Sequence, residues 1–294
     1  MMASIQMTYS RFMIERDDNM DFGKLYICAT PIGNLEDISL RTLRILNEVD
    51  FIAAEDTRHT LKLLNHFDIK KTLTSYHQHN IKEKGPKLIE KLKAGQTMAL
   101  VSDAGMPGIS DPGEHLIGLA IEEEIEVIGL PGASAMLLAL VISGLSTEKF
   151  AFEGFLPTKK NERIRELEKV KEESRTLIFY ESPHRIVESL EAMILVLGDR
   201  KASLSRELTK KFEETIRGKL SEIIEIASVR ELKGEMVVVL EGYVKPEENI
   251  DIEEMLNALI LSGMTKKDAV RKVVKETGIS KNLVYAESLK IEVK

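Results

Sequence analysis

The sequence contains a single cysteine, Cys28. One thiol cannot form an internal disulfide or a thiolate metal cluster, and such sparse cysteine is typical of a reducing compartment. The chain also lacks a long apolar run, because its longest one, residues 135–142, is too short to span a bilayer. Residues 1–22 are too polar for a signal peptide. We therefore expect a cytoplasmic protein that does not associate with membranes.

Motifs that mark common nucleotide and metal sites are missing as well. Neither a Walker-type loop nor a Gly-x-Gly-x-x-Gly spacing occurs, which argues against nucleotide hydrolysis and NAD chemistry. His77 and His79 suggest a pair of metal ligands, but no third ligand follows at a suitable spacing. We expect no metal site.

The composition that remains is ordinary for a globular protein: 294 residues, of which 43% are hydrophobic and 30% charged. This length is enough for two domains with their own cores. The net charge of −7 argues against indiscriminate nucleic-acid binding. Residues 1–150 carry −6, whereas residues 156–219 carry +3 and residues 262–294 carry +4. The two basic regions indicate either RNA contact or solvated helix faces of mixed charge.

Three short loops that contain Gly and Pro follow apolar, strand-like runs. They are residues 29–35 (ATPIGNL), 102–108 (SDAGMPG) and 130–135 (LPGASA). Loops at the carboxyl ends of strands in an open α/β sheet form the crevice where ligands bind, and glycine lets backbone amides approach the ligand. One shared cofactor pocket is therefore predicted.

Strand and helix patterns alternate in the first half of the chain, which predicts a parallel sheet. The expected strands are residues 25–29, 50–54, 97–102 and 125–129, and the expected helices are 40–47, 58–67, 81–94, 113–122 and 133–143. A second unit has expected strands at 150–154, 176–180, 202–206, 213–218 and 235–242, and helices at 161–172, 183–196 and 221–227. Its last strands lack long intervening helices, so a mixed sheet is predicted there.

A third unit follows the polar, proline-bearing linker 245–248. Three helices are expected at residues 251–262, 265–277 and 280–290, with Thr265 and Ser280 as N-caps. This pattern resembles a helix-turn-helix, which either reads RNA or serves as a docking or dimer-capping appendage. The predicted organisation is a loose extension (1–22), two α/β domains (23–146 and 147–244) and a small helical domain (249–294).

An ordered set of motifs runs through about residues 24–243. The motifs are YICATPIGNL (26–35), AEDTR (54–58), SYH (75–77), VSDAGMPGISDPG (101–113), FEGFLP (152–157), FYESPHR (179–185), RELTK (206–210) and KGE (233–235). In this order they resemble the ribosomal RNA small subunit methyltransferase I family of the tetrapyrrole methylase superfamily. The first loop reads TPIGN and not the Gly-Pro-Gly-Asp-Pro-like sequence of corrin and porphyrin enzymes, which favours the ribosomal RNA branch.

The resemblance implies a homodimer of two-domain α/β subunits that binds S-adenosylmethionine in a cleft between the domains. It also implies 2′-O-methylation of a cytidine in the decoding region of 16S ribosomal RNA, as naked RNA or in the 30S particle. Met106 stands where the family more often has Thr, and Ala133 where it more often has Pro. Two alternatives stay open: a tetrapyrrole C-methyltransferase and a non-catalytic ribosome-assembly factor.

A pocket for S-adenosylmethionine needs amides for its carboxylate, an acceptor for its ammonium or ribose, and apolar walls. The helix that starts near Ala133 offers unpaired amides. Asp103 is the best-placed acceptor, unless it only caps its own turn, and Asp111 before a proline is expected to cap a helix. With the motif order, the expected cofactor-binding residues are Pro31, Asp103, Ala104, Gly105, Met106, Ala133, Ser134, Tyr180, Leu208 and Met236.

Methyl transfer is an in-line displacement, so positioning and a general base are the expected contributions of the protein. Charged clusters at 181–185 and 206–210 follow predicted strands, and either cluster could instead be a surface salt-bridge network. The segment 55–58 is expected to contact RNA or a dimer seam. Tyr76, Tyr180 and Phe155 either stack on a splayed base or belong to the core. The expected catalytic residues are Glu207, Lys210, Arg206 and Glu181, with Glu207 or Glu181 as the base, and the expected RNA contacts are Arg58, Arg185, Lys159 and Lys160.

Overall fold

The structure is a computed structural model that describes residues 22–245 and 251–291. The expected N-terminal extension, apart from residue 22, lies outside the described residues. The chain divides into two compact units, one up to Tyr243 and one from Val244 onward. Each unit is described by itself.

The first lobe of the larger unit is built on a parallel sheet with the strand order β3-β2-β4-β1-β5. A parallel sheet was predicted, but its edge strand β3 was not. The strands are β1 (Lys24–Cys28), β2 (Phe51–Ala54), β3 (Thr72–Ser75), β4 (Met98–Val101) and β5 (Glu126–Leu130).

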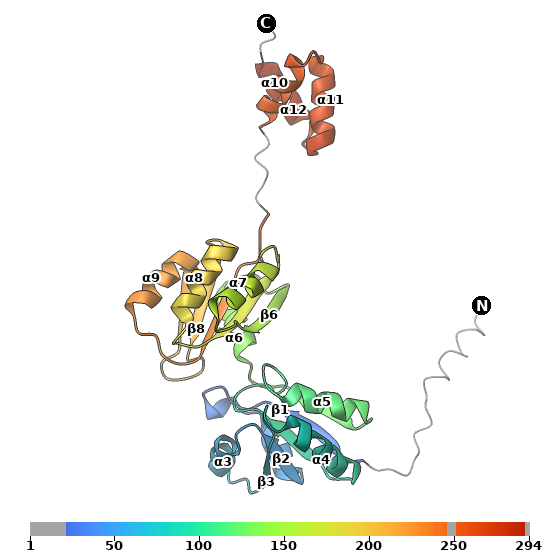
Figure 1. Ribbon diagram of the computed structural model, residues 1–294, viewed down its shortest axis with the longest axis vertical. Coiled ribbons are helices and arrows are strands. Elements are labelled where there is room, and N and C mark those ends of the chain that lie inside the picture. The colour runs from blue at the N-terminus through green and yellow to red at the C-terminus, as the bar shows by residue number, and fades with distance from the viewer. Residues whose placement is uncertain (1–21, 246–250, 292–294) are drawn as a thin grey trace, which may run out of the picture. The chain divides into compact units, whose positions relative to one another are not determined.

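Helices cover both faces of this sheet, as the near-continuous apolar strands require (Figure 1). Side chains of α4 and α5 form one core with Leu25, Phe51 and Met98, whereas α2 and α3 pack on the other face against Ile52 and Val101. The helical segments of this lobe are η1 (Leu35–Asp37), α2 (Leu40–Glu48), α3 (Thr57–His66), α4 (Ile81–Lys93), α5 (Gly113–Glu122) and α6 (Ala135–Ser143).

The second lobe has a sheet with the order β6-β7-β10-β8-β9. Only β6 and β7 pair in parallel and the other pairs are antiparallel, which confirms the predicted mixed sheet. The strands are β6 (Phe150–Phe155), β7 (Thr176–Glu181), β8 (Lys201–Arg206), β9 (Glu214–Lys219) and β10 (Met236–Leu240). The helices are α7 (Lys160–Lys169), α8 (Ile186–Leu197) and α9 (Leu220–Val229).

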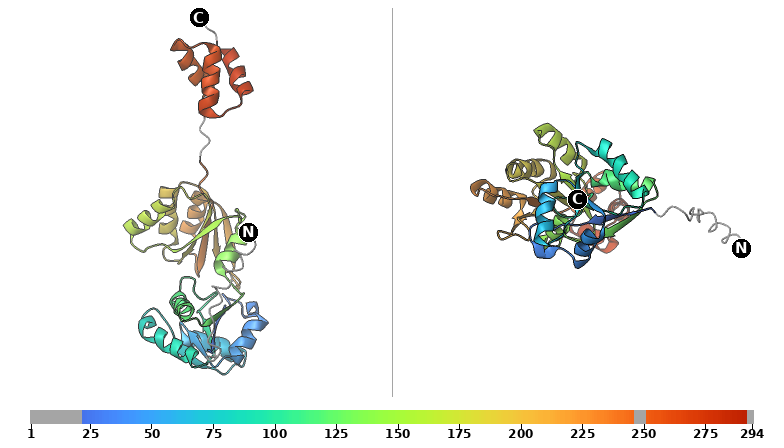
Figure 2. Two further views of the ribbon diagram at one scale, coloured as in Figure 1. Left: turned by 90° about the vertical axis from the view of Figure 1, so that its right-hand side faces the viewer. Right: turned by 90° about the horizontal axis from the view of Figure 1, so that it is seen from below.

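The two faces of this second sheet have different covers, because successive strand residues point to opposite sides. Phe179 and Val238 pack against α7, α8 and α9, whereas Ile178 and Val237 pack against α6. Figure 2 shows α6, in green, on the side of this sheet opposite to α7–α9. The helix that leaves the first sheet therefore covers the second sheet, which joins the two lobes.

The C-terminal unit consists of α10 (Ile252–Leu261), α11 (Lys266–Thr277) and α12 (Lys281–Lys290), as predicted. Thr265 caps α11 by accepting a hydrogen bond from the backbone of Asp268, whereas the Ser280 side chain makes no such bond at the start of α12. The three helices enclose a small core of their own, formed by Leu256, Ala269, Val270, Val273, Val284 and Ile291. No helix within residues 22–245 and 251–291 is long and apolar enough to cross a membrane.

Candidate active site

The first two Gly-containing loops are hydrogen-bonded to each other at the carboxyl edge of the first sheet. The Thr30 backbone N–H donates to the Gly105 carbonyl at 2.9 Å, and the Gly105 N–H donates back to the Thr30 carbonyl at 3.0 Å. The Thr30 hydroxyl also donates to the Ser102 carbonyl at 3.1 Å. The loops after β1 and β4 thus form one rigid rim.

The third loop packs against the same rim. A Cβ atom at Gly132 would lie 2.5 Å from the Cβ of Ala29, so only glycine allows this approach. A Cβ atom at Gly105 would lie 3.3 Å from Ile32 and 3.5 Å from the Ala133 carbonyl, and Gly105 has a φ of +80°. The three loops therefore lie against one another, and a cofactor pocket formed by them stays a prediction.

Asp103 links this rim to the loop after β2. The Asp56 backbone N–H donates to Asp103 Oδ1 at 2.9 Å, so the Asp103 side chain connects the loop after β4 to the loop after β2. Asp111 instead accepts hydrogen bonds from the backbones of Gly108 and Gly113, next to the start of α5. The N-cap of this helix is Pro112, one residue later than predicted, because the helix begins only at Gly113. Burial, followed by the negative charges of Asp103, Asp111 and Asp56, raises the pKa of Glu55. This edge of the sheet therefore carries a negative potential.

A strained loop of the second lobe holds the main catalytic candidates. Glu207 and Thr209 both have positive φ angles, 51° and 66°. The Lys210 ammonium donates to Glu207 Oε1 at 2.9 Å and to Glu235 Oε2 at 3.1 Å. Partial burial lowers the pKa of Lys210, but the hydrogen bonds and charges of these two carboxylates outweigh it, so its pKa lies above the ordinary value. Lys210 is therefore a cation at neutral pH.

This strained loop touches the first Gly-containing loop. A Cβ atom at Gly33 would lie 2.3 Å from Lys210 Cγ and 3.0 Å from the Leu208 carbonyl. Ile32, Ala133, Tyr180 and Leu208 belong to one apolar cluster. Loops from both sheets thus meet at one site, where the predicted cofactor-binding residues Ala133, Tyr180 and Leu208 lie near the loop of Lys210.

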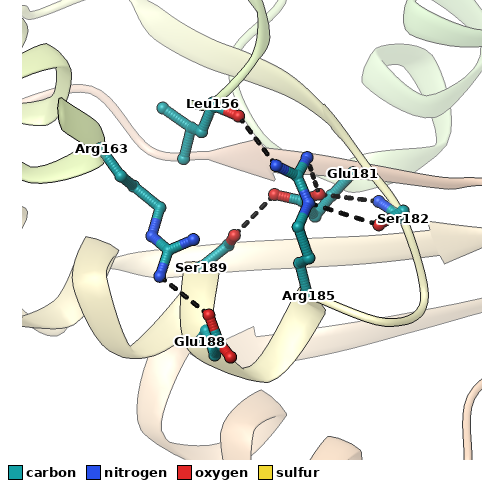
Figure 3. Close-up of polar contacts among 7 residues, drawn as sticks. All are labelled: Leu156, Arg163, Glu181, Ser182, Arg185, Glu188 and Ser189. Carbon is teal, nitrogen blue, oxygen red and sulfur yellow. Dashed lines mark hydrogen bonds and ion pairs between the residues drawn. The ribbon is translucent and has the colours of Figure 1, made fainter. Parts of the chain in front are cut away.

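Glu181 and Arg185 form a buried ion pair at the end of β7 (Figure 3). Glu181 is 3% exposed, and its Oε1 accepts hydrogen bonds from Arg185 at 2.6 Å and from the Ser182 backbone at 2.8 Å. Its Oε2 accepts a hydrogen bond from the Ser189 hydroxyl at 2.6 Å. Arg185 also donates to the Leu156 carbonyl at 3.2 Å. Both charges are therefore paired within the protein.

Arg206, Met236 and the predicted RNA contacts lie in three different environments. Arg206 is engaged by Glu214, which also binds Arg230. Met236 is 2% exposed and its side chain lies in the core beneath α7–α9, so any contact with a ligand would be through its backbone. The predicted RNA contacts other than Arg185 are exposed, and two of them are ion-paired: Arg58 with Asp56, and Lys159 with Glu162, whereas Lys160 has no such partner among the described residues.

Tyr76 belongs to the core, because it is 1% exposed and its hydroxyl lies 2.8 Å from His115 Nδ1. Phe155 is 57% exposed and its ring centroid lies 5.5 Å from that of Tyr180. Of the aromatic side chains considered for base stacking, these two remain available. Within the part of the chain that the structure describes, no group of three or more His, Cys, Asp and Glu side chains is placed to hold a metal ion.

The sequence interpretation missed a hollow of about 140 Å³ beside α3. Pro31 and Asp103 line it together with α3 residues that were not predicted to be functional, among them His59 and Lys62. Their spacing places both on one side of the helix, but the sequence does not show that this side borders a hollow.

Two α/β lobes, one parallel and one mixed, with loops of both meeting at one site, define the protein as a two-lobed α/β enzyme. The same fold occurs in uroporphyrin-III-C-methyltransferase from Thermus thermophilus, with a TM-score of 0.53 and 17% identity over 74% of this chain and 94% of that one. It also occurs in diphthine synthase, with a TM-score of 0.57 and 17% identity over 76% of this chain and 92% of that one.

The chain belongs to the family Tetrapyrrole (Corrin/Porphyrin) Methylases, which matches residues 24–224. It is 49% identical to the ribosomal RNA small subunit methyltransferase I of Halalkalibacterium halodurans over 92% of this chain and 95% of the relative. It is 45% identical to the protein of the same name from Bacillus subtilis over 90% of this chain and 94% of the relative. The protein is therefore a methyltransferase, and its resemblance to this group of enzymes is confirmed.

Proposed function

We propose that this protein uses S-adenosylmethionine to methylate the ribose 2′-hydroxyl of a cytidine in the decoding region of small-subunit ribosomal RNA. The observation that carries the proposal is the contact of the Gly33 loop with the Glu207–Lys210 loop, because it joins a predicted cofactor rim to a carboxylate and an ammonium. The names of the relatives supply the ribosomal RNA substrate, at 49% and 45% identity.

The residues at this site fit the chemistry of the cofactor. Asp103 uses one carboxylate oxygen for the Asp56 amide, which leaves the other for a hydroxyl or ammonium group. The N-terminus of α6 has no side-chain cap, so its first amides are available to a carboxylate. The buried Thr209 hydroxyl has no hydrogen-bond partner. When bound, S-adenosylmethionine supplies an electrophilic methyl carbon on a positively charged sulfur.

In this proposal Glu207 would take the proton of the ribose hydroxyl, whose oxygen would bond to the methyl carbon while the bond between that carbon and the sulfur breaks and leaves S-adenosylhomocysteine. Lys210, which stays protonated because its pKa is raised, fixes the orientation of that carboxylate and contacts the substrate. The geometry favours Glu207 over Glu181 as the base, since both oxygens of Glu181 already accept hydrogen bonds. Arg206 and Glu181 then act as positioning residues for their loops.

The wider surface suits an RNA substrate. The exposed predicted contacts Arg58, Lys159 and Lys160 would bind phosphates, and Phe155 with Tyr180 would stack on a base. We expect the substrate to be ribosomal RNA in naked form or in the 30S particle, and the protein to work in the cytoplasm where ribosomes are assembled.

We also propose that the protein is a homodimer. Leu137 and Val141, one turn apart on α6, are 43% and 70% exposed, which gives this helix an apolar strip outside its contacts with the second sheet. Sedimentation equilibrium would give twice the monomer mass of 33.1 kDa, and a single species at the monomer mass would contradict the proposal.

The test of the activity is transfer of a labelled methyl group from S-adenosylmethionine to 30S particles, followed by digestion to nucleosides. We expect the label in 2′-O-methylcytidine. The Glu207→Gln variant should lose about 10²–10⁴-fold in kcat, the range for a general base, with the Kd for the cofactor unchanged. Label on a base or on a tetrapyrrole acceptor, and none on ribose, would overturn the proposal.

Asp103→Ala provides a separate test of the cofactor site. Removal of the carboxylate should weaken S-adenosylmethionine binding in calorimetry by about tenfold, the value of one hydrogen bond to a charged group. Circular dichroism should show an intact fold. An unchanged Kd would remove Asp103 from the cofactor site.

A further inference from the structure

The hollow beside α3 lies next to the proposed cofactor site, and its lining includes residues of α3 that are not part of that site. Its lining comes from the loop after β1, the loop after β4 and the first two turns of α3. Leu63, 8% exposed, packs into the protein, so the face of α3 toward the hollow is fixed in place. The polar and charged residues of the lining are Thr30, His59, Thr60, Lys62, Ser102 and Asp103.

All three side-chain hydroxyls of this lining donate hydrogen bonds within the protein. Thr30 donates to the Ser102 carbonyl, Thr60 donates to the Asp56 carbonyl, and Ser102 donates to the Gly105 carbonyl. These bonds make the walls rigid. They also leave the recognition of a ligand to the charged side chains.

The side chains of Lys62 and His59 in this lining have no partner in the protein. Both are exposed, and neither side chain forms an ion pair or hydrogen bond with other residues of the described part of the chain. The neighbouring Arg58, by contrast, is bound by Asp56 through its guanidinium at 2.7 Å. Two cationic or donor groups thus face one hollow without an internal acceptor, which points to an anionic ligand.

The volume of the hollow and its other lining residues narrow the class of that ligand. A hollow of about 140 Å³ is smaller than the 300–1,000 Å³ that drug-sized ligands occupy, so it suits a fragment such as a phosphate with part of a sugar. Asp103 also lines the hollow, but its free carboxylate oxygen is assigned to S-adenosylmethionine in the proposed function, so it marks the side of the hollow that borders the cofactor. The apolar side chains of Pro31 and Leu35 offer contact to the face of a sugar or base.

We infer that this hollow binds the phosphate and ribose of an RNA nucleotide next to the one that is methylated, with Lys62 and His59 on the phosphate. This inference rests on the proposed function, which supplies the RNA substrate, and adds the place where the strand is held. Lys62 and His59 are then substrate-binding residues and take no part in proton transfer. Sequence-specific RNA recognition targets single-stranded segments whose bases are splayed out, and contacts to the neighbouring phosphates fix the position of such a strand.

The test compares three variants of the full chain. Lys62→Met keeps the length of the side chain without its charge, Lys62→Arg keeps the charge, and Lys70→Met removes the charge of an exposed lysine that does not line the hollow. The readouts are KM for 30S particles, kcat, the Kd for S-adenosylmethionine, and the Kd for a fluorescein-labelled single-stranded RNA oligonucleotide.

We expect Lys62→Met to raise KM and the RNA Kd about tenfold, as for one charge-assisted contact, and to leave the cofactor Kd unchanged. The slope of log Kd against log salt should fall by about 0.7, since one phosphate contact is lost. Lys62→Arg and Lys70→Met should behave like the wild type.

Two results would overturn the inference. An RNA Kd for Lys62→Met equal to that of Lys70→Met would show that the hollow does not hold the RNA. A weaker cofactor Kd with an unchanged RNA Kd would assign the hollow to S-adenosylmethionine. The oligonucleotide measurement does not depend on turnover, so a wild-type protein that binds RNA but transfers no methyl group would contradict the proposed function alone.

Discussion

Two residues of the loop 206–210 have backbone conformations that are costly for side chains other than glycine. Glu207 and Thr209 lie in the left-handed region, which costs about 1–2 kcal/mol for each residue. The loop keeps this shape because the Glu207 N–H donates to the Glu235 carbonyl and the Thr209 N–H donates to the Glu213 carboxylate at 2.6 Å. Such strain is concentrated at functional sites, and here it holds Glu207 and Lys210 beside the first lobe.

Gly33→Ala tests how closely this loop has to approach. Gly33 has no positive φ, so alanine causes no backbone strain, but its methyl group would lie 2.3 Å from Lys210 Cγ. We expect Lys210 to move away from Glu207 and kcat to fall by up to about 10²-fold, the effect of a misplaced catalytic group. Steady-state kinetics measures this loss.

Gly118→Ala is the matched control for Gly33→Ala. Gly118 lies within α5 and has nothing within 4 Å of an added Cβ atom, so alanine there should leave kcat unchanged and stabilise the helix by about 0.5–1 kcal/mol. Equal kcat values for the two variants would mean that the contact with Lys210 is not needed.

At this scale the sequence predicted the residue types of the site better than their partners. The Gly-rich loops and Asp103 were recognisable because such loops follow buried strands. The burial of Glu181 was not, because its partner Ser189 lies on the following helix and depends on how that helix packs. Lys62 was missed because nothing in the sequence shows that α3 borders a hollow.

Among the elements, α6 shows what a periodic pattern cannot tell. The predicted helix 133–143 agrees with the observed Ala135–Ser143, yet its buried side chains Ala139 and Leu140 pack against β10 of the second sheet. The helix is apolar around most of its circumference, so the sequence does not indicate which face is buried. The strand β3 was missed because it is short, partly polar and at the edge of the sheet.

Glu181→Gln tests the ion pair that supports the segment between β7 and α8. Glutamine keeps the shape of the side chain but leaves Arg185, whose side chain is 21% exposed, without its counter-charge. Breaking such a pair costs about 3–5 kcal/mol, so the midpoint of urea unfolding should fall clearly. Lys159→Met, which breaks an exposed pair with Glu162, should cost less than about 1 kcal/mol.

The same variant separates positioning from proton transfer. Under conditions where Glu181→Gln is folded, we expect its kcat to stay within a few-fold of the wild type, unlike that of Glu207→Gln. A loss of kcat as large as that of Glu207→Gln, in a protein of undiminished stability, would assign the base to Glu181.

At the scale of the whole molecule, the C-terminal unit has a core of its own, and its residues 262–294 carry a charge of +4 in a chain whose net charge is −7. Lys267, Arg271 and Lys275 are exposed on α11 at a spacing of four residues, which places them along one side of the helix. Lys267 and Lys275 form no ion pair with other described residues, whereas Arg271 lies 3.9 Å from Asp268. The alternative is a solvated face of mixed charge, which requires no ligand.

The combined variant Lys267→Glu and Lys275→Glu tests this unit in the full chain. Both side chains are exposed and lie outside the core around Leu256, so the fold and the cofactor Kd should be unchanged. If α11 binds phosphates, KM for 30S particles should rise about tenfold or more. The slope of log Kd for RNA against log salt should fall by about 0.7–0.9 for each lost contact.

A chain that ends at residue 245 should show at least the same loss of RNA affinity and keep its affinity for S-adenosylmethionine. Because the proposed catalytic residues all lie before Tyr243, an unchanged KM in both proteins would show that the larger unit binds the RNA alone and that the C-terminal helices have another role.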